Sequence, residues 1–181
     1  MKHARAEKTN AARLLDGLGI SYELRAYEVD ENDLTAVSVA RKIGLPPEQV
    51  FKTLLATASK PGAGGGDHVF AVIPGDSELD LKKLAQACGA KKVELASLRE
   101  VEPLTGYVRG GVTVMGAKRP FPAFVDRRVE RFDLISVSSG QRGLQLLLSP
   151  ADYLRASEGR LAELARAVPA EAGRMGAVPG A

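Results

Sequence analysis

Cysteine, histidine and aromatic residues are scarce in this sequence, and their scarcity excludes several kinds of chemistry. A single cysteine cannot form an internal disulfide, and one cysteine with two histidines cannot build a zinc site of the His/Cys type. His3 lies in a polar N-terminal stretch and His68 in a run that predicts a buried strand, so we expect no histidine general base. The sequence therefore predicts neither a metal site nor a cofactor.

Long hydrophobic runs are also missing. No apolar stretch approaches the length of about 18 residues that a membrane-spanning helix needs. The N-terminal segment MKHARAEKTN lacks the apolar core of a signal peptide. We therefore expect a cytoplasmic protein with no membrane partner. Tryptophan is absent and aromatic residues make up 5%, so aliphatic side chains must build the core.

Positive charge is unevenly distributed along the chain. The segment 109–142 holds seven basic and three acidic residues, a net charge of +4, against +3 for the whole chain. A basic face of this kind suits a polyanion such as RNA, although solvated surface charge explains it equally well. The residues that would contact RNA are Lys118, Arg119, Arg127 and Arg128.

The local patterns predict short helices and strands in an irregular order. Five helices are expected, each after a polar capping residue: Thr9 or Asn10, Thr35, Asp80, Ser97 and Ser149. Strands are expected over 20–24, 50–58, 68–73, 92–95, 121–125, 134–137 and 144–148, the last being the final strand before a closing helix. Because strands and helices do not alternate regularly, the expected class is α/β (α+β), a mixed sheet curled into a barrel-like core with surrounding helices.

The same patterns predict one domain between two tails. Residues 9–168 form the expected domain, residues 1–8 a flexible tail, and residues 169–181 a disordered tail rich in Ala, Gly and Pro. The glycine-rich stretch 59–67 is expected to be a flexible loop between two strands.

Lys52 is the first candidate for chemistry. It lies within VFKTLLATA, which predicts a central strand, and a lysine there must snorkel to the surface, pair, or face a polar cavity. If it faces a cavity, it is a cation held on a rigid backbone, which could bind a phosphate or stabilise a developing oxyanion. Thr53 follows it, and strand alternation would turn the two side chains to opposite faces unless the strand bulges.

Two glycine-bearing segments are further candidates. In TGYVRGG, the paired Gly110 and Gly111 let a backbone approach a ligand closely, or simply bend the chain between strands. In VSSGQRG, the hydroxyls of Ser138 and Ser139 could line a small pocket and Arg142 could bind a nearby phosphate. An ordinary hairpin turn explains that second segment as well.

Asp126 and Cys88 have more ordinary explanations. Asp126 ends the strand PFPAFVD, where it could orient Lys52, bind an amino group, or cap the strand end. Cys88 follows Leu81 and Leu84 at the spacing of one helix face, which predicts an inert core residue. We therefore expect no cysteine nucleophile.

Taken in order, several segments resemble the YbaK family of aminoacyl-tRNA deacylases, which is related to the editing domain inserted in bacterial prolyl-tRNA synthetase. The segments that carry the resemblance are GLPPEQVFKTLL, LDLKKLAQACGAKKVELA, TGYVRGG and VSSGQRGLQL, in a match from about Lys8 to Arg166. The resemblance implies a free-standing enzyme that removes a mischarged amino acid, typically cysteine from tRNA for proline. Prolyl-tRNA synthetase is a possible partner.

The resemblance also implies roles for individual residues. Lys52 matches the essential lysine of the family, Tyr27 an aromatic of the pocket, and Gly110 and Gly111 the glycine loop that shapes the amino-acid site. Ser138 and Asp126 match positions near that pocket; the further substrate-binding candidates are Thr53, Ser139 and Arg142.

The glycine loop departs from the family pattern. The family loop has Ser and Pro where this chain has Thr113 and Val114, and the aromatic expected near Thr35 is missing. These departures leave the amino acid open between cysteine and another small one such as alanine. Relatives that remove alanine tend to have a pocket histidine, for which His68 is the single candidate here.

The resulting mechanism needs no histidine. An aminoacyl ester is already activated, so positioning and oxyanion stabilisation suffice. Backbone N–H groups of Gly110 and Gly111 would hold the carbonyl oxygen and Lys52 the terminal phosphate or ribose, with water or the substrate's own thiol as nucleophile. Two alternatives remain: a non-catalytic module that binds tRNA, a nucleotide or a synthetase, and a nucleotide or small-ester hydrolase that uses Lys52 and Asp126.

Overall fold

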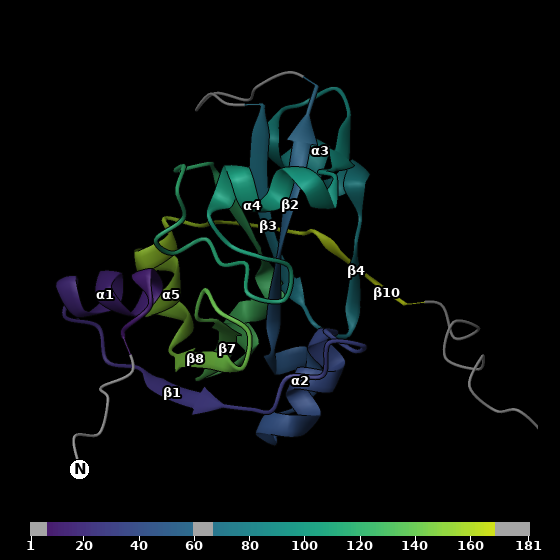
Figure 1. Ribbon diagram of the computed structural model, residues 1–181. Helices are drawn as coiled ribbons and strands as arrows, with labels where there is room; N and C mark the ends of the chain where they lie inside the picture. The colour runs from purple at the N-terminus through teal and green to yellow at the C-terminus, as the bar shows by residue number, and fades with distance from the viewer. Residues whose placement is uncertain (1–6, 60–66, 169–181) are drawn as a thin grey trace, which may run out of the picture.

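The computed structural model describes residues 7–59 and 67–168, which fold into short helices around three sheets (Figure 1). The α-helices are α1 (Asn10–Gly17), α2 (Ala36–Ile43), α3 (Leu81–Cys88), α4 (Leu98–Thr105) and α5 (Pro150–Ser157). Two 3-10 helices are η1 (Pro47–Gln49) and η2 (Arg127–Arg131). The strands are β1 (Glu23–Ala26), β2 (Phe51–Ala58), β3 (His68–Pro74), β4 (Ser77–Leu79), β5 (Val93–Leu95), β6 (Ala123–Asp126), β7 (Ile135–Ser138), β8 (Leu144–Leu148), β9 (Arg160–Ala162) and β10 (Ala165–Ala167).

The helix ends follow the predicted capping chemistry. The side chains of Thr9, Thr35, Asp80 and Ser149 each accept a backbone N–H at the start of a helix. Ser97 and Glu100 complete the predicted capping box at the start of α4. Because these bonds are local, the sequence alone was enough to place the five helices.

The largest sheet is mixed, and its order is β5-β2-β3-β6-β9. β2 pairs with β3 and β5 in antiparallel fashion, whereas β3 pairs with β6, and β6 with β9, in parallel. A second sheet has the order β1-β8-β7, and β10 pairs with β4. The predicted mixed α/β class is confirmed. The sheets do not close into a barrel, because in the described residues an isolated bridge between Val50 and Ser136, not a continuous ladder, links β2 to β7.

The hydrophobic core lies on both faces of the central pair β2 and β3. On one face, Leu84 of α3 packs with Ile73 and Phe124. On the other face, Phe51 packs with Leu15 of α1 and Tyr153 of α5, both fully buried. Figure 1 shows α1 and α5 together on the side away from β4 and β10. The core therefore fixes β2, the strand that carries Lys52, from both faces.

The predicted strands were wrong in three respects. The segment 144–148 is not the last strand, because β9 and β10 follow α5, and the chain does not close on a helix. The short strand β4 was also missed. These three-residue strands have no alternating pattern of their own and exist through pairing with distant partners, such as Ala165 with Leu79. The first strand begins at Glu23 rather than residue 20, since Ile20 packs into the core.

Residues 1–6, 60–66 and 169–181 lie outside the described part of the chain, and so do most of the predictions made for the two tails and the glycine-rich loop. Lys8, which was assigned to the N-terminal tail, forms an ion pair with Asp16 of α1. Within the described ranges, no helix has the length and apolar character that a membrane span requires.

Candidate functional site

A cavity of about 440 Å³ lies beside the first half of β2. Its walls come from residues 34–37 and Val39 around the start of α2, residues 50–55 just before and in β2, residues 95, 96, 98 and 101 before and in α4, and Arg109, Gly110 and Val112 of the glycine loop. Ser138 and Gln145 complete it from the β7-β8 pair. The volume is within the range of about 300–1,000 Å³ that is usual for small-ligand sites.

The cavity exists because the edge of β2 is only partly covered. Among the described residues, β5 pairs with Ala56–Ala58 and no strand forms a hydrogen-bonded ladder along residues 51–55 on that edge. The cavity runs along that open edge. Lys52 and Thr53 therefore both border it, although strand alternation turns their side chains to opposite faces.

Lys52 is half-buried, and its ammonium is held close to a turn. Its Nζ lies 3.5 Å from the carbonyl oxygen of Gly75, a long contact for a group with three hydrogen-bond donors. Burial lowers the pKa of Lys52, while the nearby charges of Asp76 and Glu78 oppose this shift. The ammonium therefore lies beside the cavity, and this one long contact within the described residues leaves it donors for a ligand.

Backbone conformation explains the need for Gly110, and packing explains the need for Gly111. Gly110 has φ +87°, a left-handed conformation that residues with a Cβ rarely adopt, although a Cβ there would find space beside Arg142. A Cβ on Gly111 would lie 3.2 Å from backbone atoms of Gln141. The Nε of Arg142 donates to the carbonyl oxygen of Arg109 at 2.7 Å, so the loop and the β7-β8 turn are joined.

The two glycines are not equivalent as donors. The N–H of Gly111 donates to the carbonyl oxygen of Val108 at 2.9 Å and is thus engaged within the loop. Gly111 does not line the cavity, whereas Gly110 does. In this conformation, Gly110 is the better placed of the two predicted oxyanion donors.

Tyr107 anchors the glycine loop, a role that the sequence reasoning missed. Its hydroxyl donates to the carbonyl oxygen of Met115 at 2.8 Å, which closes the loop from one end to the other. Its ring covers Gly140, where φ is +98° and a Cβ would lie 2.7 Å from the ring. Burial raises the pKa of Tyr107 to about 12. The signal for this role in the sequence was a tyrosine three positions before a glycine pair.

Ser138 and Gln145 form the polar end of the cavity. They are paired across β7 and β8, and Gln145 is buried, with its Oε1 accepting from the Ser136 hydroxyl at 3.0 Å. Sequence reasoning missed Gln145, although an amide in the apolar strand LQLLL must find a buried partner. Ser139 is fully buried and does not line the cavity, and its hydroxyl has no partner in the described residues.

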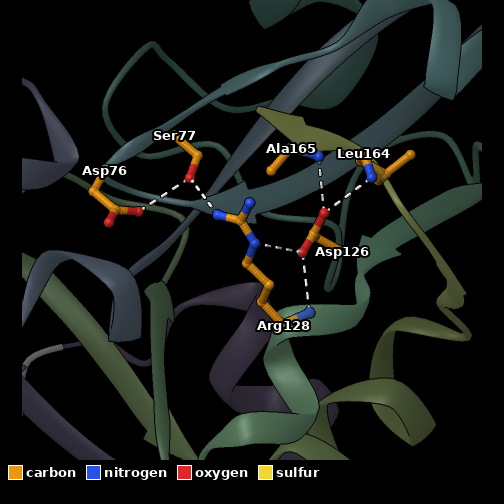
Figure 2. A network of polar contacts seen from close by, with 6 residues as sticks. All are labelled: Asp76, Ser77, Asp126, Arg128, Leu164 and Ala165. Carbon is orange, nitrogen blue, oxygen red and sulfur yellow. Dashed lines mark hydrogen bonds and ion pairs between the residues drawn. The ribbon is translucent and has the colours of Figure 1, made fainter. Parts of the chain in front are cut away.

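Three other predicted substrate contacts lie away from the cavity wall. Tyr27 packs against α2, with Nζ of Lys42 6.0 Å from its ring centroid. Arg142 lies behind the cavity wall, where its Nε is beside Gly110 and donates to the carbonyl oxygen of Arg109. Asp126 is buried at the end of β6 and does not line the cavity. Its carboxylate accepts hydrogen bonds from the backbone N–H groups of Leu164 and Ala165 (Figure 2). The strand-end capping explanation of Asp126 is the one that this geometry supports.

The predicted RNA contacts fall in two places. Lys118 and Arg119 are exposed just beyond α4. Arg127, also exposed, and Arg128, half-buried, border a second cavity of about 460 Å³. That cavity also has acidic walls, from Glu130 and Glu163 among others, so its charge is mixed. In residues 7–59 and 67–168, no cluster of three potential metal ligands occurs.

Comparison with known proteins identifies the family. Residues 30–156, more than two thirds of the chain, match the aminoacyl-tRNA editing domain. The chain belongs to the aminoacyl-tRNA editing domain family. EbsC of Enterococcus faecalis, provisionally named a Cys-tRNA(Pro)/Cys-tRNA(Cys) deacylase, is 40% identical over 158 residues, which cover 87% of this chain and 93% of EbsC.

Two further relatives of this editing-domain protein extend the comparison. The multifunctional Ser/Thr-tRNA deacylase ProXp-y of Escherichia coli is 34% identical over 106 residues, 58% of this chain and 64% of the relative. A crystal structure provisionally described as a trans-editing enzyme for prolyl-tRNA synthetase is 22% identical, with a TM-score of 0.71 over 89% of this chain and 99% of that one. At that identity, the structural likeness shows the shared fold.

Proposed function

We propose that this protein is a free-standing deacylase that removes a mischarged amino acid from tRNA, with cysteine on tRNA for proline as the first candidate. The observation that carries the proposal is the convergence of the Lys52 ammonium, Gly110 and Ser138 on one cavity, in a chain of the editing-domain family. The names of EbsC and ProXp-y support the reaction class, and that of EbsC supports cysteine.

The cavity suits the end of an aminoacyl-tRNA. A cysteinyl group fills only part of about 440 Å³, which leaves room for the ribose of the terminal adenosine. Lys52 would donate to that ribose or its phosphate, and the N–H of Gly110 to the ester carbonyl oxygen. Apolar walls from Val39, Leu55 and Val112 would exclude water and strengthen both interactions.

Among residues 7–59 and 67–168, neither cysteine nor histidine lines this cavity. Cys88, the last residue of α3, packs in the core, and the His68 ring contacts Phe121 with centroids 5.3 Å apart. We therefore propose that the nucleophile is a water molecule or the thiol of the substrate itself. In the second route, the thiol attacks its own carbonyl carbon, the ester bond breaks, and the ribose oxygen leaves with the proton.

The tRNA itself would be held weakly. We propose that exposed cations, with Lys118, Arg119 and Arg127 as candidates, contact phosphates of the acceptor stem without reading its sequence. Prolyl-tRNA synthetase is the proposed partner that supplies tRNA selection. Because the substrate is made in the cytoplasm, we also propose a cytoplasmic location.

The test is a deacylation assay on tRNA for proline charged with cysteine or alanine. We expect Lys52→Ala to lower kcat/KM for the preferred substrate by about 100-fold or more, as for loss of one preorganised donor. Lys82→Ala, at an exposed position on α3, is the matched control and should keep full activity.

Each outcome has a definite meaning. Release of cysteine but not alanine supports the thiol route, and release of both points to water as nucleophile. Release of alanine alone moves the specificity assignment. If neither is released, these substrates are wrong, and seryl-tRNA and threonyl-tRNA come next because ProXp-y is named for them. Full activity of Lys52→Ala would reject the role of Lys52.

A further inference from the structure

The turn between β3 and β4 holds the ammonium of Lys52. The carbonyl oxygen of Gly75, in this turn, lies 3.5 Å from Nζ of Lys52. The N–H of Gly75 donates to the carbonyl oxygens of Val50 at 2.7 Å and Pro47 at 3.2 Å. A Cβ on Gly75 would lie 2.8 Å from Cβ of Ala36 and from the Val50 oxygen, so the turn is pressed against η1 and α2. The backbone side of the turn is thus fixed.

The side-chain side of the turn is fixed by a directed chain of hydrogen bonds (Figure 2). Nη1 of Arg128 donates to the hydroxyl of Ser77 at 2.9 Å, and that hydroxyl lies 3.1 Å from Oδ1 of Asp76. Because a guanidinium can only donate, the single hydroxyl proton of Ser77 is left for the Asp76 carboxylate. Ser77 is 2% exposed, so water does not compete freely for these bonds.

Arg128 is in turn held by Asp126. The Nε of Arg128 lies 3.9 Å from Oδ1 of Asp126, which also accepts the backbone N–H of Arg128 at 3.0 Å. The other carboxylate oxygen accepts the N–H groups of Leu164 at 2.9 Å and Ala165 at 2.8 Å. The chain of contacts thus runs from the start of β10 to the turn beside Lys52.

We propose that Arg128 and Ser77 are positioning residues for Lys52, because they fix the Asp76 carboxylate in the turn that holds its ammonium. This inference rests on the function proposed for Lys52. The charges that act on the ammonium are Asp76 in the turn and Glu78 on β4. Arg109 lines the same cavity from the glycine loop. The cavity walls from α2, β7 and β8 carry no charged side chain.

A direct effect of the Arg128 charge on Lys52 makes the opposite prediction. Arg128 is itself a cation, so the loss of its charge alone would favour the charged form of Lys52 and raise the pKa of Lys52. If Arg128 instead acts by holding Asp76, its removal frees that carboxylate and lowers the pKa of Lys52. Ser77→Ala breaks the same link without changing any charge, so it isolates the positioning effect.

The experiment is an NMR titration of the Lys52 side chain in protein labelled with ¹³C-lysine, with Lys52→Arg used for assignment. We expect Ser77→Ala and Arg128→Gln each to lower the pKa of Lys52 by roughly 0.5 to 1. Arg128→Lys, which keeps a donor, should restore part of the loss. Arg127→Gln, at the exposed neighbouring position, is the matched control and should leave the pKa unchanged.

The outcomes separate this inference from the proposed function. An unchanged pKa of Lys52 in Ser77→Ala, or a raised one in Arg128→Gln, overturns the positioning role. The titration needs no substrate, so it remains valid if deacylation fails. If the pKa of Lys52 falls but the pH profile of kcat does not move, positioning stands and the role of Lys52 in the reaction is rejected. Should Arg128→Gln fail to fold, Ser77→Ala decides alone.

Discussion

Substitution of Gly140 by alanine should damage both stability and activity, because this glycine supports the ring of Tyr107. Gly140 lies in the turn between β7 and β8 with φ +98°, a backbone conformation that residues with a side chain rarely adopt. Its Cβ would lie 2.7 Å from Cε1 and 3.2 Å from Cζ of Tyr107. The ring must move, and its hydroxyl holds the far end of the glycine loop through the carbonyl oxygen of Met115.

The expected magnitude has two parts. Left-handed backbone at a residue with a Cβ costs about 1–2 kcal/mol. Overpacking against a ring costs about 1–3 kcal/mol. Together they predict a loss of about 2–5 kcal/mol in the free energy of unfolding. At about 2–4 °C per kcal/mol for a chain of this size, Tm should fall by roughly 4–20 °C.

Two other glycines separate these parts in a urea unfolding series. Gly19 has φ +66° with nothing within 4 Å of its Cβ position, so Gly19→Ala should show the backbone cost alone. Gly17, in α1, has no positive φ and no close neighbour, so Gly17→Ala should be neutral or slightly stabilising. If Gly140→Ala loses no more stability than Gly19→Ala, the ring contact does not matter and the reasoning is refuted. Deacylation by Gly140→Ala should also fall below that of Gly19→Ala.

The remaining predictions concern pH and the single cysteine. Burial raises the pKa of Tyr107 to about 12 and also raises the pKa of Tyr153. The native state therefore holds these protons more tightly than the unfolded chain. The stability that the two protonated tyrosines contribute is complete below a pH of about 10 and is lost as pH rises towards 12. Urea unfolding from pH 9 to 11 should show a fall in the free energy of unfolding. Tyr107→Phe should reduce that fall. Cys88→Ala should keep full deacylation while losing about 1 kcal/mol of stability, because Cys88 is a core residue; inactivity of a folded Cys88→Ala would contradict this.

The helices were predictable because their signals are local. Thr35, Asp80 and Ser149 cap the first turns that follow them, and Gly44 and Gly89 adopt the left-handed conformation that ends α2 and α3. The strands β4, β9 and β10 were not predictable in the same way. Each has three residues, and the pairing that defines it comes from a strand far away in the sequence.

The candidate site was predictable in part. Lys52, Thr53, Gly110 and Ser138 border one cavity, as a lysine in an apolar strand and a glycine pair had indicated. The role of each stays a prediction until activity is measured. For Asp126, strand-end capping was among the predicted roles, but its partners could not be deduced, because they are backbone N–H groups of Leu164 and Ala165, near the end of the described chain.

The late strands β9 and β10 have a consequence for the order in which the protein folds during synthesis. β9 pairs in parallel with β6, and β10 pairs with β4, where the paired residues Ala165 and Leu79 are 86 positions apart in the sequence. A nascent chain synthesised only as far as residue 157 lacks both strands and the two N–H groups that hold Asp126. The ribosome must therefore release residues 160–167 before the turn beside Lys52 gains its full support, so a truncated nascent chain would carry the candidate site without that support.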